Sequence, residues 1–455
     1  MDPINAETLA RWAEGKLLSG SPSSTATTLC TDSRALKAGD LFLALRGETF
    51  DGHAFIPQAA QTGAMGVIAE EVPAGLPSDF VVIVVADTLR ALQSIAAQYR
   101  RTLDLEVVAI TGSNGKTSTK DFTAAVLGER FKVTKTAGNF NNHIGLPLTM
   151  LAAQATHEAG VFEIGMNHPG EIAPLAAMAM PDVAIITNVG IAHIEFMGSR
   201  EAIAQEKGML AEAVDTGGHV ILCAEDDFSE AIAARTKAKV LLCGIEKGAV
   251  RATDVRHDFS GTSFTLHAEG REVEVTLPVP GVHMVRNALL AIGAGLVLGL
   301  TPEQCVAGLS HLKLSKGRLE QKLIRGIHFL DDTYNANPDS MAAALRTLAQ
   351  MPTSGRRIAV LGRMGELGSQ SEAGHQSVGE VAAQLGIDVV IGVGAEPALT
   401  VEAAGRGGVG RAIKTATIKE GIEALRGVAE PGDIVLVKGS RSSRMERIVE
   451  GLQAL

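Results

Sequence analysis

The stretch from Val107 to Ser118 has the composition of a phosphate-binding loop, because a β-branched apolar run stops at glycines and a polar segment begins at Lys116. Glycines let backbone N–H groups approach phosphate oxygens, and the N-terminus of a helix adds a positive dipole. Lys116 supplies a point charge, and the Thr117 hydroxyl can ligate Mg²⁺. These features predict an ATP site formed by Gly112, Ser113, Asn114, Gly115, Lys116, Thr117 and Ser118.

This loop is shorter than the common P-loop. The common pattern has a glycine six residues before the lysine, where this chain has Ile110, and Gly112 stands two residues later. A plain glycine-rich turn is the alternative interpretation. The strand before the loop and the helix after it favour the nucleotide site.

Three further residues could act beside bound phosphates. Glu163 ends a buried apolar strand, where a carboxylate needs a compensating cation such as Mg²⁺. The alternative is a strand-end glutamate that points to solvent. His193 lies on the loop after another strand, which carries it toward the same crevice, although a single histidine is often merely packed or solvated. Lys207 by itself has the pattern of a solvated helical lysine.

Two polar segments follow strands near the C-terminus. Residues 331–341 read Asp-Asp-Thr-Tyr-Asn-Ala-Asn-Pro-Asp-Ser-Met, which holds more hydrogen-bonding side chains than a turn needs. We expect Asp339 or Ser340 to cap the next helix. Residues 438–444 also end an apolar strand and begin a helix, an arrangement that binds carboxylates or phosphates, with a capped and solvated helix start as the alternative.

The glycine-rich segment 362–368 also follows a predicted strand. Its glycines have the spacing Gly-x-x-Gly-x-x-Gly and lack the close first pair of a dinucleotide fingerprint. We therefore do not expect a nicotinamide cofactor there.

The composition limits the class of protein. A chain of 455 residues is long enough for three domains of ordinary size. The formal net charge is -10 and the basic residues are dispersed, so no nucleic-acid partner is expected. The four cysteines lack metal-ligand spacing, and the chain starts without a leader-like segment and holds no apolar run long enough for a membrane span. These features predict a cytoplasmic protein without membrane insertion.

The elements that must position these residues are those of an α/β protein. In the N-terminal part we expect strands at 40–45 and 65–69 and a helix that ends near 101. In the central part, the near-continuous apolar runs at 161–164 and 183–187 suit a buried parallel sheet. Alternating residues at 263–267 and 272–275 predict a hairpin.

The C-terminal part repeats the pattern of strand, helix and strand. We expect strands at 327–330, 358–361, 389–393 and 434–437, with helices between them, which indicates a second doubly wound unit. The predicted domains are 1–104, 105–313 and 314–455.

Taken in order, these segments resemble the Mur ligases, the ATP-dependent amide-forming enzymes of peptidoglycan precursor synthesis, over nearly the whole chain. Residues 111–117 resemble the family's shortened phosphate loop, which accounts for the missing early glycine. Residues 31–34, 39–42 and 47–53 are similar to the N-terminal domain that holds a UDP-sugar. The resemblance implies a small UDP-binding domain, a central P-loop-type ATPase domain and a C-terminal Rossmann-like domain that binds the acceptor.

The resemblance also implies roles for single residues. Lys116 would hold the β- and γ-phosphates, Thr117 and Glu163 one Mg²⁺, and His193 a second. Lys207 would be carbamylated and become an anionic Mg²⁺ ligand. The implied contacts to the rest of ATP come from Asn287, Arg318 and Asp332, and those to the uridine diphosphate from Ser33, Arg34, Glu48, Thr49 and Phe50. The implied contacts to the acceptor come from Asn335, Asn337, Ser440 and Arg441.

The C-terminal turn varies among members of the family. Residues 334–341, 139–145, 165–172 and 438–442 resemble the member that adds D-alanyl-D-alanine to UDP-N-acetylmuramoyl-tripeptide, and the Asp-Asn-Pro-Arg string of diamino-acid-adding members is absent from the sequence. This implies amide formation through an acyl phosphate by an enzyme expected to be a monomer. The diamino-acid-adding ligase, a folylpolyglutamate synthetase and, in another class, a nucleotide-binding regulatory module are the alternatives.

Overall fold

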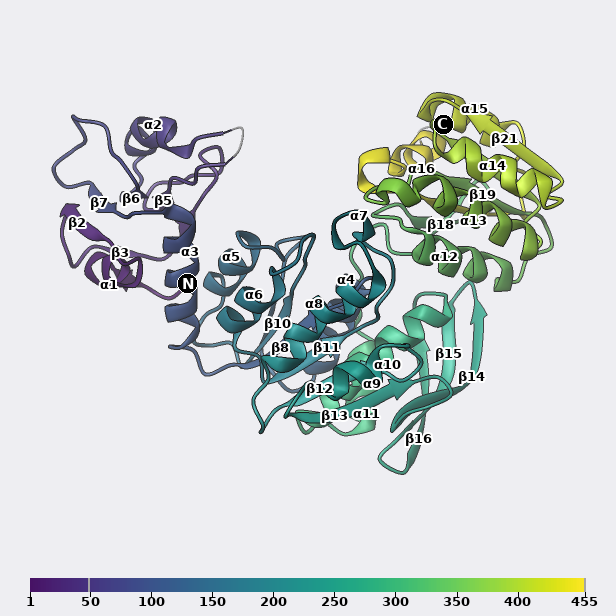
Figure 1. Cartoon of the computed structure of the whole chain (residues 1–455), viewed down its shortest axis with the longest axis horizontal. Helices are drawn as coiled ribbons and strands as arrows, with labels where there is room; N and C mark the ends of the chain where they lie inside the picture. The colour runs from purple at the N-terminus through teal and green to yellow at the C-terminus, as the bar shows by residue number, and fades with distance from the viewer. Residues whose placement is uncertain (48–49, 454–455) are drawn as a thin grey trace. The chain divides into compact units, whose positions relative to one another are not determined.

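The computed structural model describes residues 1–47 and 50–453, and its described strands form sheets of two, five, six and nine strands (Figure 1). The predicted residues Glu48 and Thr49 lie outside the described part. The chain divides into two compact units. The first comprises Met1–Ala109, Phe131–Gly165 and Ala173–Asp182, and the second comprises Ile110–Arg130, Met166–Ile172 and Val183–Leu455.

The N-terminal part is built on a five-stranded sheet with the order β2-β7-β6-β5-β4. Its strands are β2 (Lys16–Ser19), β4 (Leu29–Cys30), β5 (Leu41–Leu43), β6 (Gly66–Ala69) and β7 (Val81–Val84). All neighbours are parallel except β2 and β7. A small antiparallel pair is formed by β1 (Ile4–Asn5), which directly precedes α1 (Ala6–Trp12), and β3 (Thr25–Ala26).

Three helical segments complete this part: η1 (Gly52–Phe55), α2 (Ile56–Gln61) and α3 (Thr88–Arg100). Asp87 begins α3 by accepting a hydrogen bond from the backbone N–H of Arg90. The core beneath is made of buried apolar residues such as Phe42, Ile56 and Val67. The strands predicted at 40–45 and 65–69, and the helix predicted to end near 101, are confirmed.

The central sheet has the order β16-β15-β14-β13-β12-β11-β8-β10-β9. Its strands are β8 (Glu106–Thr111), β9 (Val133–Lys135), β10 (Ala159–Glu163), β11 (Val183–Ile186), β12 (His219–Cys223), β13 (Lys239–Gly244), β14 (Val250–Asp258), β15 (Gly261–Ala268) and β16 (Arg271–Leu277). The predicted strands near 161 and 183 and the hairpin β15–β16 are confirmed. The hairpin is extended by β14, an antiparallel partner of β15 that was not predicted from the sequence.

The helices of the central part are α4 (Lys116–Leu127), α5 (Gly145–Leu151), α6 (Ile172–Ala179), α7 (Ile194–Met197), α8 (Arg200–Glu212), α9 (Ser229–Ala233), α10 (Val282–Val297) and α11 (Pro302–Leu309). The long helix α10 packs against α4 and against β12, β13 and β14. Most of its residues are apolar, and this composition allows the helix to be buried between these elements. It therefore fixes the phosphate-loop helix against the sheet.

The C-terminal sheet has the order β17-β18-β22-β19-β20-β21. Its strands are β17 (Glu320–Ile324), β18 (Ile327–Asp332), β19 (Arg357–Leu361), β20 (Val389–Val393), β21 (Arg411–Thr415) and β22 (Ile434–Lys438). The four predicted strands are confirmed. The two strands that were not predicted, β17 and β21, are the edges of the sheet, and both carry charged residues, as edge strands often do.

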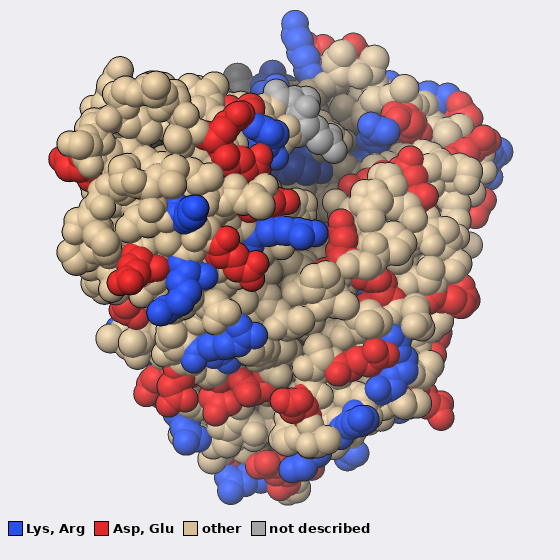
Figure 2. Space-filling view, turned by 60° about the vertical axis from the view of Figure 1, so that its left-hand side comes forward, with Lys and Arg blue, Asp and Glu red and all other residues tan. Residues whose placement is uncertain are grey.

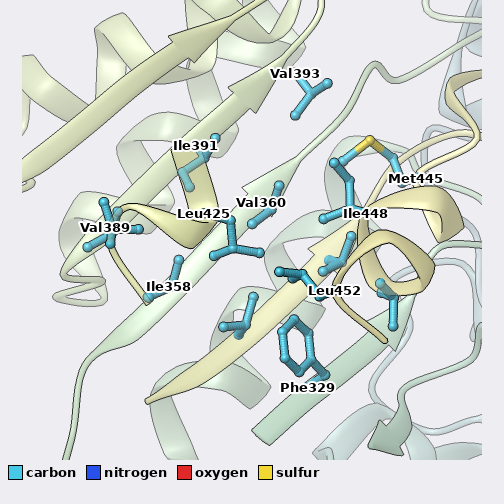
Figure 3. Packing of buried hydrophobic residues seen from close by; sticks show 14 of the residues in the cluster. Phe329, Ile358, Val360, Val389, Ile391, Val393, Leu425, Met445, Ile448 and Leu452 are labelled. Atoms are coloured by element: carbon cyan, nitrogen blue, oxygen red, sulfur yellow. The ribbon is translucent and has the colours of Figure 1, made fainter. Parts of the chain in front are cut away.

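The helices here are α12 (Pro338–Gln350), α13 (Ser371–Gln384), α14 (Pro397–Arg406), α15 (Ile418–Arg426) and α16 (Glu446–Gln453), with short turns η2 (Gly368–Gln370) and η3 (Arg441–Ser443). One face of the sheet packs against α15 and α16 through buried residues that include Phe329, Ile391 and Ile448 (Figure 3). This parallel core places the carboxyl ends of β18, β19 and β22 beside one another.

Charges are mixed on the surface. Basic and acidic residues are interspersed over the face shown in Figure 2. None of the helices among the described residues has the length and apolar composition that a bilayer span requires.

Candidate functional site

The phosphate loop lies between the end of β8 and the start of α4. Gly115 has a φ of 81°, and a Cβ atom there would lie 2.5 Å from Oδ1 of Asn287, so glycine is needed for both conformation and space. A Cβ atom on Gly112 would lie 1.8 Å from Oγ1 of Thr187. The N-cap residue of α4 is Gly115, which has no side chain that could cap the helix. Its first N–H groups therefore offer hydrogen bonds to an anion.

The end of β11 anchors this loop. The backbone N–H of Ser113 donates to the carbonyl of Asn188 at 2.9 Å, and the N–H of Asn114 donates to Oδ1 of Asn188 at 3.0 Å. The N–H of Gly190 donates to the Ser113 hydroxyl at 2.9 Å. These contacts fix the loop and tie it to the segment that leads to His193.

Lys116 folds back over its own loop. Its ammonium donates to the carbonyl of Gly112 at 2.7 Å. Thr117, the next residue, is buried, and its hydroxyl accepts a hydrogen bond from Nη2 of Arg318 at 3.3 Å. Arg318 also lies over the ring of Tyr334, 4.1 Å from its centre. The structure thus brings together three residues that the sequence assigned to ATP.

The two other residues assigned to ATP lie on different elements. Asn287 is buried on α10, beside Gly115 as described. Asp332 ends β18, forms an ion pair with Lys438 at 2.6 Å and accepts a hydrogen bond from the N–H of Leu319 at 3.3 Å. Asn287 therefore lies at the phosphate loop, whereas Asp332 belongs to a paired network at the end of the C-terminal sheet.

Glu163 is 2% exposed at the end of β10. One carboxylate oxygen accepts a hydrogen bond from Nδ2 of Asn141 at 2.8 Å. The other oxygen is buried and finds no hydrogen-bond partner among the described residues. A buried carboxylate oxygen without a donor is costly, so its chemistry fits a bound cation.

Lys207 is 1% exposed on α8, contrary to the solvated lysine that its local sequence suggests. Burial lowers the pKa of its ammonium well below 10.5, and the charge of Lys116 lowers it further. The adjacent Glu206 accepts hydrogen bonds from the N–H groups of Gly170 and Ile172 and so holds the start of α6. The lowered pKa favours the neutral, nucleophilic amine over the ammonium.

His193 begins α7 in a left-handed conformation with a φ of 62°. Its Nδ1 lies 2.6 Å from a carboxylate oxygen of Glu366. The contact with His193 lowers the pKa of Glu366. The sequence analysis did not select Glu366, since only the glycines of its loop were considered.

The N-terminal residues assigned to uridine diphosphate form a polar turn. Ser33 is half-buried, and the exposed Arg34 donates to both oxygens of Asp32 at 2.9 and 2.7 Å. The Arg34 guanidinium lowers the pKa of Asp32 to about 2. Phe50 is 52% exposed and stacks on Phe55 with ring centres 5.1 Å apart. An exposed, supported aromatic ring of this kind can stack with a base.

The residues assigned to the acceptor are largely occupied by the fold. Asn337 accepts a hydrogen bond from the N–H of Ser340 and donates to Oδ1 of Asn114 at 2.8 Å. Asn337 is thus the N-cap of α12. Ser340 takes part in capping as the N3 residue of the capping box, whereas Asp339 is not the cap. The backbone carbonyl of the exposed Asn335 accepts from Lys438 at 2.9 Å.

The second acceptor segment is similar. The Ser440 hydroxyl accepts a hydrogen bond from the N–H of Gly365 at 2.7 Å and donates to the carbonyl of Ala336 at 3.3 Å. Arg441 has a 69% exposed side chain and pairs with Glu446 at 3.2 Å. Arg441 therefore keeps more freedom to meet a ligand than Ser440.

The side chains of His, Cys, Asp and Glu do not gather in threes as a metal-binding group among the residues that the structure describes. Any Mg²⁺ held by Thr117, Glu163, His193 and Lys207 would need a hydroxyl, a modified lysine and ligand phosphates. Oxygen donors of this kind suit Mg²⁺, which usually keeps few protein ligands.

Three family models match successive parts of the chain. The model of the Mur ligase family catalytic domain matches residues 25–100. The Mur ligase middle domain matches residues 110–295, and the Mur ligase glutamate ligase domain matches residues 317–441.

Complete relatives and solved structures also match nearly the whole chain. A UDP-N-acetylmuramoyl-tripeptide–D-alanyl-D-alanine ligase of Bacillus subtilis is 39% identical over 93% of this chain and 92% of its own. A crystal structure of MurF from Acinetobacter baumannii has a TM-score of 0.92 and 33% identity, with all of both chains covered. The MurF ligase of Thermotoga maritima, solved in complex with ADP, has a TM-score of 0.84 and 29% identity over 94% of this chain and 97% of its own.

Proposed function

Because the chain belongs to the Mur ligase family, we propose that it joins D-alanyl-D-alanine to UDP-N-acetylmuramoyl-tripeptide, with conversion of ATP to ADP and phosphate. The observation that carries this function is the 39% identity to the Bacillus subtilis ligase over 93% of the chain. The match covers all three parts of the α/β Mur ligase fold. The diamino-acid-adding ligase and the folylpolyglutamate synthetase therefore become less favoured alternatives, and the regulatory module the least.

ATP is proposed to lie on the loop 112–118. The uncapped start of α4 and the ammonium of Lys116 would face the phosphates, and Arg318 reaches the same loop through Thr117. The ADP complex of the Thermotoga maritima relative supports nucleotide binding. Asn287 would meet adenine, and Asp332 the ribose.

Thr117, Glu163, His193 and Lys207 are proposed to hold Mg²⁺. The unpaired oxygen of Glu163 supports this assignment. The neutral amine of Lys207 would add to CO₂ and lose one proton, which gives an anionic carbamate in place of a cation. A bound Mg²⁺ would neutralise charge on the phosphates during transfer.

The proposed reaction begins when the terminal carboxylate of the tripeptide attacks the γ-phosphate, so that an acyl phosphate forms and ADP leaves. The neutral amine of D-alanyl-D-alanine then attacks the acyl carbon and releases phosphate, with loss of one proton. Two anions must approach in the first step. Lys116 and the N–H groups of α4 would offset their repulsion, a contribution of positioning and electrostatics.

The substrate contacts are proposed on the N-terminal and C-terminal parts of the chain. Ser33, Arg34, Phe50 and the two undescribed residues Glu48 and Thr49 are proposed for the uridine diphosphate. Asn335, Asn337, Ser440 and Arg441 are proposed for the dipeptide, although the structure uses two of these side chains elsewhere. The enzyme is proposed to act as a monomer, and the domain limits at 104 and 313 stay predictions.

The decisive assay measures phosphate release and amide product with UDP-muramoyl tripeptides that carry lysine or diaminopimelate, each with D-alanyl-D-alanine or D-alanine. We expect phosphate release to require both a tripeptide substrate and the dipeptide. Release without an acceptor, or with single D-alanine alone, would contradict the proposal. Lys116→Ala should abolish turnover, and a near-normal rate in that variant would refute the nucleotide assignment.

A further inference from the structure

The glycine-rich loop 362–368 has a role that neither its glycine spacing nor the proposed roles above explain. It follows β19 and brings Glu366 to His193, where a carboxylate oxygen and Nδ1 lie 2.6 Å apart, within ion-pair distance, although Nδ1 is not in hydrogen-bond geometry with any described residue. The two residues are 173 positions apart in the sequence and lie on different sheets' loops, after β19 and after β11. Their contact therefore joins the C-terminal part to the central part within the second compact unit.

The loop is held rigidly where it carries Glu366. The N–H of Gly365 donates to the Ser440 hydroxyl at 2.7 Å, and the N–H of Met364 donates to Nε2 of the buried His375 at 3.2 Å. Nδ1 of His375 in turn lies 2.8 Å from the carbonyl of Ser371. Glu366 has a φ of 60°, an uncommon conformation for a residue with a side chain, which persists where the surroundings fix it.

The C-terminal part also accepts hydrogen bonds from the backbone on both sides of His193. Asp339 accepts a hydrogen bond from the N–H of Ile191 at 2.9 Å. The carbonyl of Glu366 accepts from the N–H of Glu195 at 3.4 Å. A Cβ atom on Gly368 would lie 3.0 Å from Cγ of Glu195, so the small residue permits this approach. The C-terminal part therefore contacts both the side chain of His193 and the backbone on either side of it.

We propose that Glu366 is the positioning residue for His193: its carboxylate, which lies within ion-pair distance of Nδ1, accepts the Nδ1 proton when the ring turns toward it, fixes the ring and leaves Nε2 with a free lone pair. A histidine that binds a metal commonly donates its other ring N–H to a carboxylate, which sets the tautomer and orientation. The proposal rests on the proposed ligase function, in which His193 contacts bound Mg²⁺. It makes docking of the C-terminal part a condition for an ordered His193.

A double-mutant cycle between Glu366 and His193 tests the coupling. Glu366→Ala should lower kcat by about 10- to 100-fold with a smaller change in KM for the dipeptide. Glu366→Gln should lose less, because its amide oxygen can still accept the Nδ1 proton. In a His193→Ala background, Glu366→Ala should have no further effect, since it acts through the ring. Additive losses, or an unchanged kcat in Glu366→Ala, would overturn the proposal.

The matched control is Glu372→Ala. Glu372 is an exposed glutamate on α13 of the same part of the chain, where it accepts a hydrogen bond from the Gln376 amide. Its removal should leave kcat within about twofold of the wild type, as expected for a surface substitution. A comparable loss in this control would indicate a general effect of charge removal rather than positioning.

Nitrogen NMR of the isotopically labelled histidines gives a measurement that does not depend on turnover. In the neutral wild-type ring, His193 should carry its proton on Nδ1, and Glu366→Ala should yield a mixture of tautomers. A wild-type proton on Nε2 would refute the proposal. If the wild type forms no ligase product while His193 shows the expected tautomer, the proposed function fails and the positioning role stands.

Discussion

Two buried lysines, one in the central part of the molecule and one in the C-terminal part, differ in whether their ammonium groups have hydrogen-bond and ion-pair partners. Lys207 on α8 is 1% exposed, and no hydrogen bond or ion pair of its ammonium is found among the described residues. Lys438 at the end of β22 is 2% exposed and donates to Asp332 at 2.6 Å and to the carbonyl of Asn335 at 2.9 Å. Burial lowers the pKa of both groups.

The difference separates a lysine that supports the fold from one that is suited to chemistry. The charge of Lys438 is compensated by Asp332, so the pair ties the turn after β18 to the end of β22. Lys207 forms no ion pair among the described residues, and although the charge of Glu206 opposes the shift, burial lowers its pKa and so favours the neutral amine, the form in which an amine reacts. We expect substitutions at the two positions to have opposite consequences for activity and stability.

Of the two lysine variants, Lys207→Met should give the larger loss of activity. If the carbamate is needed, turnover should fall on the order of 10³-fold, since an anionic ligand of the Mg²⁺ that would neutralise the reacting phosphates is lost. Lys207→Glu should recover part of the rate because it restores an anion. Phosphate release in buffers with and without bicarbonate measures this, and a Lys207→Met enzyme with wild-type kinetics at low bicarbonate would eliminate the carbamate.

Lys438→Met should give the largest effect on stability. Removal of the ammonium leaves the buried Asp332 carboxylate without its cation, which should lower the free energy of unfolding by about 3–5 kcal/mol. Lys207→Met should leave the free energy of unfolding unchanged or higher, because a buried and uncompensated ammonium is replaced by an apolar chain. Denaturant unfolding in bicarbonate-depleted buffer compares them, and equal losses in both variants would break the distinction between the lysines.

The pH dependence of stability should report the lowered pKa of Lys207, and Lys438 should add a contribution of the same sign because burial lowers its pKa too. The folded pKa of Lys207 lies below its ordinary 10.5, so the unfolded chain binds more protons between those two values. The free energy of unfolding should therefore rise with pH across that window, with a slope of up to about 1.4 kcal/mol per pH unit from this group. Lys207→Met should flatten the curve. A wild-type curve that falls as pH rises through the window would contradict the buried neutral amine.

The sequence predicted the phosphate loop because its signal is local: strand, glycines, lysine and helix are contiguous between Val107 and Ser118. The parallel strands were predicted for the same reason, as continuous apolar runs. The burial of Lys207 could not be predicted locally, since the residues around it in α8 include Glu206 and Gln205, which are typical of an exposed helix. Its depressed pKa depends on Lys116, which lies 91 positions earlier in the chain.

Glu366 was missed for a related reason. The sequence around a loop glutamate does not indicate which residue it contacts. Glu366 and His193 meet because the loops after strands of two different sheets lie together in the fold. The signal that could have directed attention to it was the loop itself, because a glycine-rich turn after a parallel strand lies at the edge where sites form. The edge strands β17 and β21 were missed because their charged residues conceal the apolar alternation.

The smallest predicted effect concerns Asn337, whose hydrogen bonds are used by the fold as those of Lys438 are. Asn337→Ala removes the cap of α12 and the contact to Asn114, and Thr417→Ala removes the cap of α15 without touching the phosphate loop. Each variant should lose about 1 kcal/mol of stability. Asn337→Ala alone should also raise KM for ATP by about 2- to 5-fold, since one hydrogen bond to the loop is lost. Steady-state kinetics with ATP and the dipeptide varied in turn separates the two roles. If KM for D-alanyl-D-alanine rises instead, Asn337 meets the acceptor, and the bonds seen here are exchanged when the substrate binds.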